Sequence, residues 1–367
     1  MAYTYEIERY SVRKALEGKD VYRERKGKPV DAERALYLST VRIMPEKPLC
    51  IVQILHGIDE HKERYLPFAT YLASRGMGVV LHDLRGHGRS LLPEGLGYCG
   101  EEAVALLHTD IDSVYASAFL PIPESGTMEI TPADMPAVDP IPRYLLGFSM
   151  GALLAGSYAG RYDERLAGVI FAGLPHREPL VSLALGWIRL LSVTNGENGR
   201  PTLLNKYSFR RYNRPFRRAG ESGSFLWLSE DLENIDRFRA DPACGAPMTI
   251  SLYRFLLTME RDMYTPASWE MLRRDLPIWL FSGEKDPVAG GEKWVLDSET
   301  FLADMGYTHI ENRLFPQCRH EIFFDKTRNG VWQEVADCML ETVPDEQARL
   351  DEIRAKEEAT YTSMFEK

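Results

Sequence analysis

The short segment Tyr144-Leu-Leu-Gly-Phe-Ser-Met-Gly151 constrains the fold of this chain more than any other stretch. Three residues suited to a buried strand lead into the pattern Gly-x-Ser-x-Gly, and a run of helix-forming residues follows it. A serine on a tight strand-to-helix turn has its hydroxyl exposed above the edge of a sheet. Gly147 and Gly151 let the neighbouring backbone approach without a Cβ clash. We therefore predict that Ser149 is a nucleophile; the alternative is a buried turn serine that caps the helix.

Composition narrows the class of protein. The net charge of −10 over 367 residues argues against a nucleic-acid partner. No apolar run approaches the roughly twenty residues that span a bilayer, and no basic-then-apolar leader opens the chain. The five cysteines are scattered without a C-x-x-C pair, which favours reduced thiols in a cytoplasm over a disulfide or zinc framework. We therefore expect a cytoplasmic protein, and the sequence carries no signal for its oligomeric state.

Apolar segments that alternate with helical patterns predict an α/β fold with a mostly parallel, doubly wound sheet and helices on both faces. The expected central strands are 50–55, 78–82, 144–148, 168–172, 277–283 and 310–315. The expected helices are 62–75, 101–119 and 330–341, besides the one after Ser149. Residues 3–7 and 35–43 alternate like edge strands, and the proline-rich stretch 121–142 is expected to be a surface loop.

The alternation of strands and helices is interrupted once, between about residues 175 and 272. This interruption predicts a core of residues 1–174 and 273–344 with a helical cap, residues 175–272, inserted between its two parts. The last stretch, 345–367, is highly charged and is expected to be a solvated helix or tail.

A nucleophilic serine needs a base, and the base needs an orienting acid. Asp286 lies three residues after the strand that ends at Gly283, and His320 follows the last strand. The chain order Ser149, Asp286, His320 is that of α/β-hydrolases. We predict that these three residues form a catalytic triad, with Glu284 as a local rival to Asp286.

An oxyanion hole needs two backbone donors near the nucleophile. The amide of Met150, at the start of the helix after Ser149, is the first candidate. The loop His56-Gly57-Ile58, directly after the first central strand, is the place for the second. We predict that the amides of Ile58 and Met150 stabilise the oxyanion.

Several motifs together give a specific resemblance. His56-Gly-x-x-Glu-His61, His82-Asp-x-Arg-Gly-His-Gly-x-Ser90, Gly-x-Ser-Met-Gly and the late Asp and His resemble the monoacylglycerol lipase / lysophospholipase family of α/β-hydrolases, of the serine aminopeptidase S33 type. The resemblance runs from about Cys50 to Cys338 and is weakest in the cap; a segment from Arg237 to Gly245 is similar to one in bacterial members. It implies an α/β-hydrolase fold and hydrolysis of a small acyl ester, such as a monoacylglycerol or lysophospholipid, without a cofactor.

The chain departs from the family pattern in two places. Phe148 stands where the family usually has His, and Ile58-Asp59 replaces the common Ala-Gly. Neither change removes a catalytic group, but a branched Ile58 is expected to narrow the pocket and to disfavour a large headgroup. A peptidase or thioesterase on the same fold, and a non-catalytic binding protein, are the alternative functions.

The cap contains a segment, Leu180–Leu191, that is apolar nearly all round. One interpretation is that it forms an acyl-binding wall, with Leu185 and Trp187 as substrate-binding residues; the other is plain packing within the cap. Trp227, Phe255 and Tyr264 are further candidates for the wall.

The cap also packs five arginines into residues 209–218 of an acidic protein. They predict either a solvated surface paired with acidic neighbours or a surface that attracts a phosphate headgroup or a membrane. A transient contact of the cap with a membrane is therefore a hypothesis.

The sequence also contains residue patterns that occur in cofactor and metal sites. The segment Gly95–Gly100 matches the dinucleotide pattern G-x-G-x-x-G, but no clear strand precedes it. The groups His56/Asp59/His61 and His82/Asp83/His87 contain metal-binding residue types. Because the resemblance assigns them to shaping of the loops, we expect neither a cofactor nor a metal.

Overall fold

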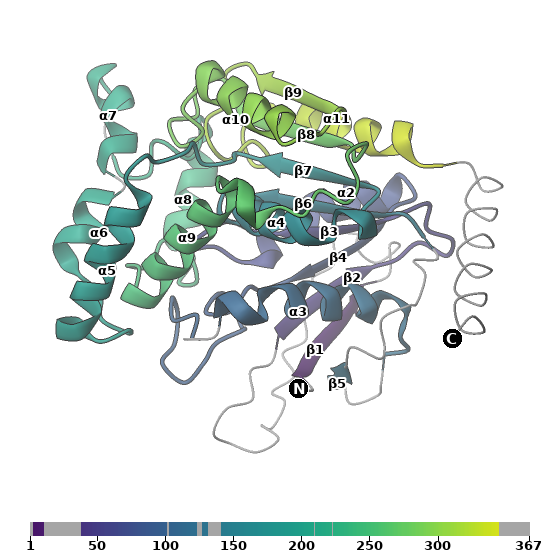
Figure 1. The fold of residues 1–367 in the computed structure, drawn as a ribbon, viewed down its shortest axis with the longest axis horizontal. Helices are drawn as coiled ribbons and strands as arrows, with labels where there is room; N and C mark the ends of the chain where they lie inside the picture. Colours follow the sequence, from purple (N-terminus) through teal and green to yellow (C-terminus); the bar gives the residue numbers. More distant parts are fainter. Residues whose placement is uncertain are drawn as a thin grey trace.

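The computed structural model describes residues 3–10, 38–100, 103–122, 127–130, 141–208, 210–221 and 223–344. A twisted central sheet carries helices on both faces, and a separate group of helices lies beyond one end of its strands (Figure 1). The charged segment 345–367 lies outside the described residues.

The described residues form one nine-stranded sheet in the order β5-β1-β2-β4-β3-β6-β7-β8-β9. The strands are β1 Tyr3–Tyr10, β2 Leu38–Ile43, β3 Ile51–Leu55, β4 Gly78–His82, β5 Thr127–Ile130, β6 Arg143–Phe148, β7 Gly168–Ala172, β8 Ile278–Gly283 and β9 Ile310–Phe315. Neighbouring strands run parallel except at the pairs β2–β4 and β1–β5. In the centre, Leu146 of β6 pairs with Ile54 of β3 and Ile170 of β7.

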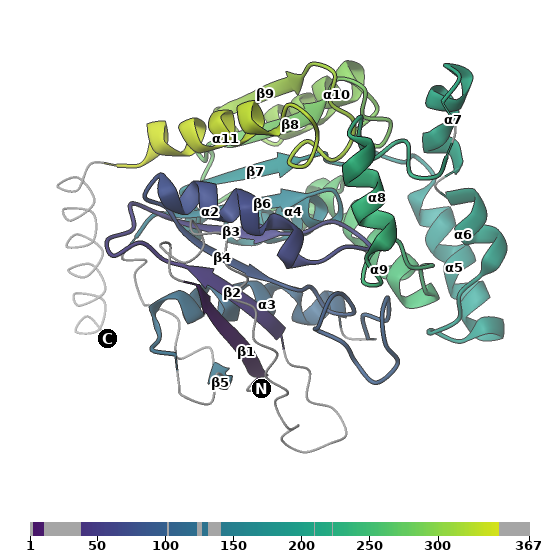
Figure 2. The same ribbon diagram turned by 180° about the vertical axis from the view of Figure 1, so that it is seen from behind.

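Two layers of helices cover the sheet (Figures 1 and 2). The helices are α2 Leu66–Ser74, α3 Ala103–Ala116, α4 Met150–Tyr162, α5 Val181–Asn195, α6 Thr202–Ser208, α7 Arg210–Arg218, α8 Leu232–Ala240, α9 Ile250–Met263, α10 Glu292–Asp304 and α11 Arg328–Thr342. Short 3-10 turns are η1 Lys62–Tyr65, η2 Ser117–Phe119, η4 Asp163–Arg165 and η5 Pro266–Ser268. One apolar core joins the sheet to α3, α4, α9 and α10, and a second joins it to α2 and α11.

This arrangement confirms the predicted fold class, a mostly parallel α/β-hydrolase sheet. The strands β3, β4, β6, β7 and β8 are buried along their whole length, as continuous apolar runs in a parallel sheet require. In the edge strand β9, by contrast, half-buried and exposed residues alternate along most of the strand, and none is fully buried.

The expected loop at 121–142 differs from the structure in one respect. It contains β5, which pairs antiparallel with β1 and so extends the sheet at that edge. This pairing depends on a strand more than a hundred residues earlier in the chain, which no local proline or glycine signal reveals. The helix expected at 101–119 is present as α3, and the 3-10 turn η2 follows it.

Five helices, α5 to α9, lie between β7 and β8 in the chain. The helices α5 to α8 lie beyond the carboxyl ends of the strands (Figure 1), whereas α9 belongs to the apolar core around α4. A Cβ at Gly156 of α4 would come within 2.1 Å of the Met263 sulfur in α9, so the two helices are in close contact. No helix among the described residues is long and apolar enough to cross a bilayer.

Candidate active site

The turn that carries Ser149 is strained and closely packed. The strand β6 ends at Phe148, α4 begins at Met150, and Ser149 between them has a φ of 54°. A Cβ at Gly147 would lie 2.1 Å from the carbonyl oxygen of Gly151, and one at Gly151 would lie 2.1 Å from that of Leu55. Both glycines are therefore required sterically for the helix to start this close to the strand ends.

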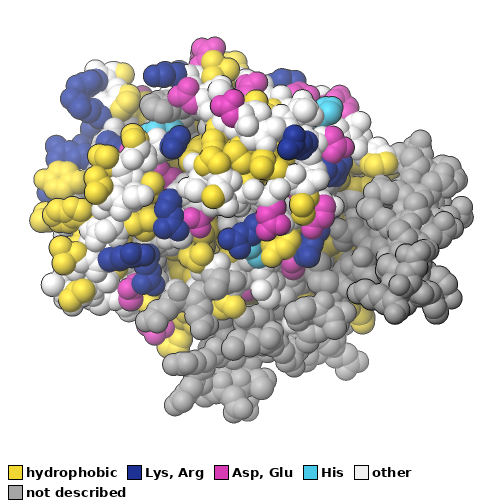
Figure 3. Space-filling view, in the orientation of Figure 1, with side chains coloured by type: hydrophobic (Ala, Val, Ile, Leu, Met, Phe, Trp, Pro, Cys, Tyr) yellow, Lys and Arg dark blue, Asp and Glu magenta, His cyan; other side chains and the backbone are white. Residues whose placement is uncertain are grey.

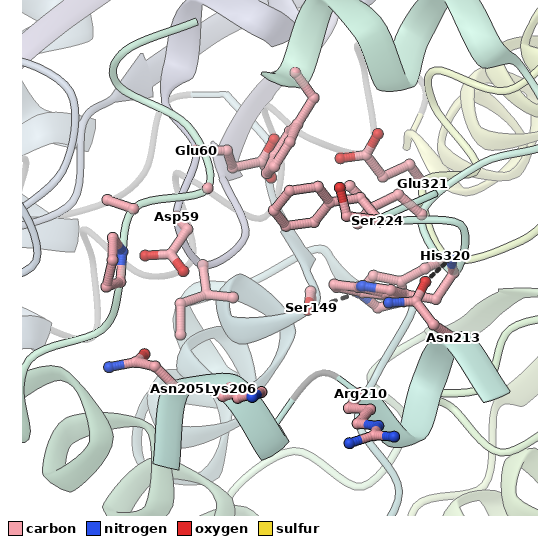
Figure 4. A pocket seen from close by; sticks show the side chains of 18 of the residues that line it. Asp59, Glu60, Ser149, Asn205, Lys206, Arg210, Asn213, Ser224, His320 and Glu321 are labelled. Carbon is pink, nitrogen blue, oxygen red and sulfur yellow. Dashed lines mark hydrogen bonds between the residues drawn. The ribbon is translucent and has the colours of Figure 1, made fainter. Parts of the chain in front are cut away.

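Ser149, His320 and Asp286 form one chain of hydrogen bonds. Ser149 Oγ lies 2.8 Å from His320 Nε2, and His320 Nδ1 lies 2.8 Å from Asp286 Oδ2 (Figure 4 shows the first of these). The other oxygen of Asp286 accepts hydrogen bonds from the amides of Val288 and Ala289, which fix the carboxylate. The arrangement holds a histidine with one nitrogen on the serine hydroxyl and the other on a carboxylate, as nucleophilic catalysis requires.

The imidazole of His320 is enclosed by aromatic rings. It is 1% exposed, and the rings of Phe148 and Trp227 lie 4.9 Å and 5.1 Å from it, centroid to centroid. The rival acid, Glu284, is exposed and accepts a hydrogen bond from the amide of Gln317. The structure therefore brings Asp286, and not Glu284, to the histidine.

The two amides predicted for the oxyanion hole are free of hydrogen bonds within the part of the chain that the structure describes. Among the described residues, neither Ile58 N nor Met150 N donates a hydrogen bond to a protein group. The loop before Ile58 is held by Glu60, whose Oε1 accepts hydrogen bonds from the amide of Gly57 and the hydroxyl of Tyr65, both at 2.7 Å. Glu60 thus fixes the preceding peptide, and the carbonyl of the peptide that carries the Ile58 amide accepts a hydrogen bond from His56 Nδ1 at 2.7 Å.

Ser149 and His320 open onto a cavity of about 410 Å³ between the sheet edge and α6 to α8 (Figure 4). Its apolar walls are Ile58, Phe148, Phe225, Trp227, Leu228, Phe238 and Pro247. Polar side chains line it as well, among them Asp59, Lys206, Arg210 and Arg217. Its size and mixed lining are typical of small-molecule sites.

The substrate wall predicted on α5 does not lie at this cavity. Leu185 is buried on α5, which packs against α9, and Trp187 is 68% exposed on the outer side of the helix; neither lines the cavity. Phe255 and Tyr264 are buried in the core instead. Of the residues suggested for the wall, only Trp227 lines the cavity, and the sequence had no periodicity that pointed to Phe225, Leu228 or Phe238.

Asp59 is the carboxyl group in the cavity without a bonded partner. It is 7% exposed, and among the described residues no group donates a hydrogen bond to its side chain. Burial raises the pKa of Asp59 to about 7, although the positive charge of Arg200 lowers it in part. Glu60 differs, because Arg64, Tyr65 and the Gly57 amide all bind its carboxylate.

His56 and Asp83, one from each of the two loop motifs, bind backbone groups and so shape the loops. His56 Nδ1 donates to the carbonyl of Gly57, and its Nε2 accepts from the amide of Leu84. Burial lowers the pKa of His56 well below its usual value, with a further contribution from His87, so the ring stays neutral. Burial alone would raise the pKa of Asp83, but the Lys62 ammonium at 2.9 Å holds it below its usual value.

One cluster of metal-binding residue types exists among the described residues. The ligand atoms of His61, Asp241 and Cys244 lie within 4.8 Å of one another. His61 Nε2 is hydrogen-bonded to Asp241 Oδ2 at 2.8 Å, and this bond links the core to the loop after α8. Burial raises the pKa of the Cys244 thiol, so this sulfur is held in its neutral form. The segment Gly95–Gly100 lies in the long loop between β4 and α3. Because it does not follow β4 directly, it does not form the tight strand-to-helix turn of a dinucleotide site.

The fold and this site define an α/β-hydrolase with a serine, a histidine and an aspartate in hydrogen-bonded sequence. Residues 46–327 match the family described as "Serine aminopeptidase, S33", and the chain belongs to this family.

Relatives and solved structures agree with this family. The chain is 23% identical over 299 residues to the monoacylglycerol lipase of Mycolicibacterium smegmatis, covering 80% of this chain and 89% of the relative. The thermostable carboxyl esterase of Bacillus coagulans superposes with a TM-score of 0.68 at 23% identity, over 83% of this chain and 93% of the esterase. The monoacylglycerol lipase of Paleococcus ferrophilus gives a TM-score of 0.57 at 18% identity, over 83% and 99%. At these identities the solved structures establish the fold.

Proposed function

We propose that this protein is a serine hydrolase that cleaves carboxylic esters of small acyl substrates through an acyl-enzyme intermediate. The observation that carries the proposal is the hydrogen-bonded chain from Ser149 through His320 to Asp286 at a cavity with apolar walls. The names of the similar proteins, monoacylglycerol lipase and carboxyl esterase, support the same class of substrate.

The residues have distinct roles in this mechanism. Ser149 attacks the ester carbonyl while His320 takes its proton and passes it to the leaving alcohol. Asp286 keeps the imidazole in the correct tautomer and stabilises its cationic form. The amides of Ile58 and Met150 stabilise the oxyanion. Water that His320 activates then releases the acid and restores the serine.

The alcohol and the acyl chain meet different surroundings in the cavity. Phe225, Leu228 and Phe238 offer an apolar wall suited to an acyl chain. Lys206, Arg210 and Arg217 add positive charge at α6 and α7. A monoacylglycerol, a lysophospholipid or a similar acyl ester fits this combination. We also propose that residues 175–272 act as the cap, with α9 as the helix that ties it to the core.

A peptidase or thioesterase is the second candidate, and the family description favours the peptidase. The same groups would cleave an aminoacyl amide or an acyl thioester. Acyl glycerol, acyl thioester and aminoacyl amide substrates of matched chain length, measured side by side, separate these activities. We expect kcat/KM to be highest for the acyl glycerol. A preference for the amide or thioester by tenfold or more would overturn the ester assignment, and binding without turnover of any activated ester would favour a non-catalytic protein.

We further propose that the outer face of the cap makes transient contact with a membrane. Seven large apolar side chains are more than half exposed on this face: Leu180, Leu183, Trp187, Leu190, Val193, Leu203 and Tyr207. Five of them recur every three or four residues at or in α5, so they form one stripe along the helix. Figure 3 shows apolar and basic side chains gathered over the end of the molecule where α5 to α7 lie.

The charge beside this stripe selects an anionic membrane. The arginines of α7 surround a hollow of about 540 Å³, and Arg210 and Arg217 line both this hollow and the catalytic cavity. Arg211 is paired with Glu178, whereas Arg214 and Arg218 are exposed and form no ion pair with another residue in the described part of the chain. Guanidinium groups beside an apolar stripe suit anionic phosphate headgroups at a lipid surface. Such contact would place the cavity near its lipid substrates.

Co-sedimentation with vesicles tests this contact. We expect binding to phosphatidylcholine vesicles that contain phosphatidylglycerol, weaker binding to pure phosphatidylcholine, and release by salt. L183E/W187E should abolish the binding, and R214E/R218E should remove its dependence on anionic lipid. L272E is the matched control, because Leu272 is 60% exposed and its neighbour Arg273 is bonded to Asp163 at the other end of the strands. Equal binding of all variants, or self-association through the stripe without vesicle binding, would contradict the proposal.

A further inference from the structure

Strain in the backbone is concentrated at the cavity that contains Ser149. Five non-glycine residues among those described have a positive φ: Asp59, Ser149, Phe225, Met271 and Gln317. The first three line this cavity. Such conformations cost free energy and are found where the surrounding structure enforces them, often at functional sites. Ser149 is explained by the strand-to-helix turn, but Asp59 needs a separate account.

Asp59 is unfavourable for folding in two respects. Its φ of 54° suits glycine better than a residue with a side chain. Its carboxyl is buried, and none of the described residues donates a hydrogen bond to it. The charge that acts on this carboxyl is that of Arg200, whose guanidinium donates its hydrogen bonds to the carbonyls of Leu96 and Pro247 instead. A largely buried carboxyl to which no protein group donates costs stability.

The position of Asp59 connects this cost to the substrate. It directly follows Ile58, whose amide is proposed to hold the oxyanion, so its backbone lies about 4 Å along the chain from that of Ile58. In the view of Figure 4, Ser149 lies between Asp59 on one side and His320 on the other. The backbone of Asp59 is held in place because its carbonyl accepts a hydrogen bond from Gly245 at 2.9 Å. The carboxyl is therefore presented to a molecule that occupies the cavity.

We infer that Asp59 is a specificity-determining residue that accepts a hydrogen bond from a hydroxyl or ammonium group of the substrate, close to the scissile bond. The missing donor comes from the substrate. The inference rests on the proposed ester hydrolysis and adds a substrate class: acyl esters that carry such a donor, in preference to plain alkyl esters. A site built to bind a donor discriminates strongly against analogues that lack it, because its own polar group is then left unpaired.

The variant D59G tests this inference without a folding defect. Glycine removes the carboxyl and adopts this φ without steric strain, so the melting temperature should stay the same or rise. We expect kcat/KM for esters with the donor to fall about tenfold or more, while the methyl ester of the same acyl chain keeps its rate. D59N should retain part of the activity on hydroxyl esters, since its amide oxygen still accepts a hydrogen bond, and should lose a preference for an ammonium group.

Three donor-bearing substrates locate the group that Asp59 binds. A monoacylglycerol carries hydroxyls on the alcohol side, a 3-hydroxyacyl methyl ester carries one on the acyl side, and an aminoacyl methyl ester carries an ammonium group. The loss in D59G should be confined to one or more of these three. Q317G is the control, because Gln317 has a φ of 60°, is exposed and does not line the cavity.

The outcomes separate this inference from the proposed function. Equal losses on all esters, a lower melting temperature for D59G, or no change on any donor-bearing ester would overturn the role of Asp59 while ester hydrolysis stands. Absence of hydrolysis of every ester by the wild-type protein would overturn both.

Discussion

The edge of the sheet and the helices that cover it are built differently. At the carboxyl ends of the strands, Ser149, Asp286 and His320 each follow a parallel strand within a few residues, so the strands place them. In the cap, the cavity wall comes from short helices and the irregular segments between them, as for Phe225, Trp227 and Phe238. We therefore expect the core to determine the chemistry and the cap to determine the choice of substrate.

Removal of the proposed nucleophile should have the largest effect, and it tests whether the core carries the chemistry. S149A should lower kcat/KM on p-nitrophenyl esters by about 10⁴-fold or more, because it removes the hydroxyl that is hydrogen-bonded to His320. The melting temperature should be nearly unchanged, since one oxygen is lost. Substantial activity in the folded variant would show that the sheet edge does not carry the chemistry.

The two candidate acids provide a matched pair. D286N should lower kcat/KM by about 10³- to 10⁴-fold, because an amide oxygen and NH2 group cannot hold His320 in the same tautomer and charge state. E284Q changes an exposed carboxylate two residues away and should leave the rate unchanged. If E284Q gave the larger loss, the assignment of the acid would be reversed.

Acyl-chain length measures the contribution of the cap. Each buried methylene should add up to about 0.8 kcal/mol, nearly fourfold in kcat/KM, until the cavity is full. F238W should make the rise level off at a shorter chain, and F238A should flatten it, with acetate hydrolysis retained in both. W187A, on the exposed side of α5, should leave the profile unchanged. An unchanged profile in both Phe238 variants would mean that the wall lies elsewhere.

The smallest expected effect is on stability, at the boundary between core and cap. Because the pKa of Asp59 is raised to about 7 in the folded protein, wild type binds one more proton than the unfolded chain between about pH 4 and pH 7. Its free energy of unfolding should therefore fall as the pH rises through this range. Besides burial, the charge that acts on Asp59 is that of Arg200. D59N lacks this proton.

Denaturant unfolding of wild type and D59N at pH 5 and pH 8 measures this effect. The stability of D59N relative to wild type should increase by on the order of one to a few kcal/mol from pH 5 to pH 8. A difference that is independent of pH would show that the carboxyl keeps its ordinary pKa.

The part of the molecule that the sequence predicts well is the part with local rules. Gly147, Ser149 and Gly151 mark the strand-to-helix turn, and continuous apolar runs mark the buried strands, so the fold class followed from pattern alone. The roles of Asp286 and His320 stay predictions, but their places after β8 and β9 follow from the topology of parallel sheets.

The cap could not be predicted in the same way. The apolar segment at 180–191 does form α5, yet Trp187 faces outward. Apolar residues alone do not distinguish a helix face that lines a cavity from one that lies on the surface, so the sequence could not predict this orientation. The residues that line the cavity are brought together by tertiary packing over about two hundred and sixty residues of chain, from Ile58 to Glu321. The unpaired state of Asp59 is visible only once its neighbours are known.

Covalent labelling tests most directly whether Ser149 is the nucleophile. Wild-type protein treated with a fluorophosphonate probe and analysed by peptide mass spectrometry should carry one adduct, on Ser149, with loss of esterase activity in proportion to labelling. S149A should remain unlabelled, and prior incubation with a slowly hydrolysed ester should slow the reaction of wild type. A folded wild-type protein that hydrolyses esters without ever reacting at Ser149, or that is inactivated by an adduct on another residue, would contradict the account.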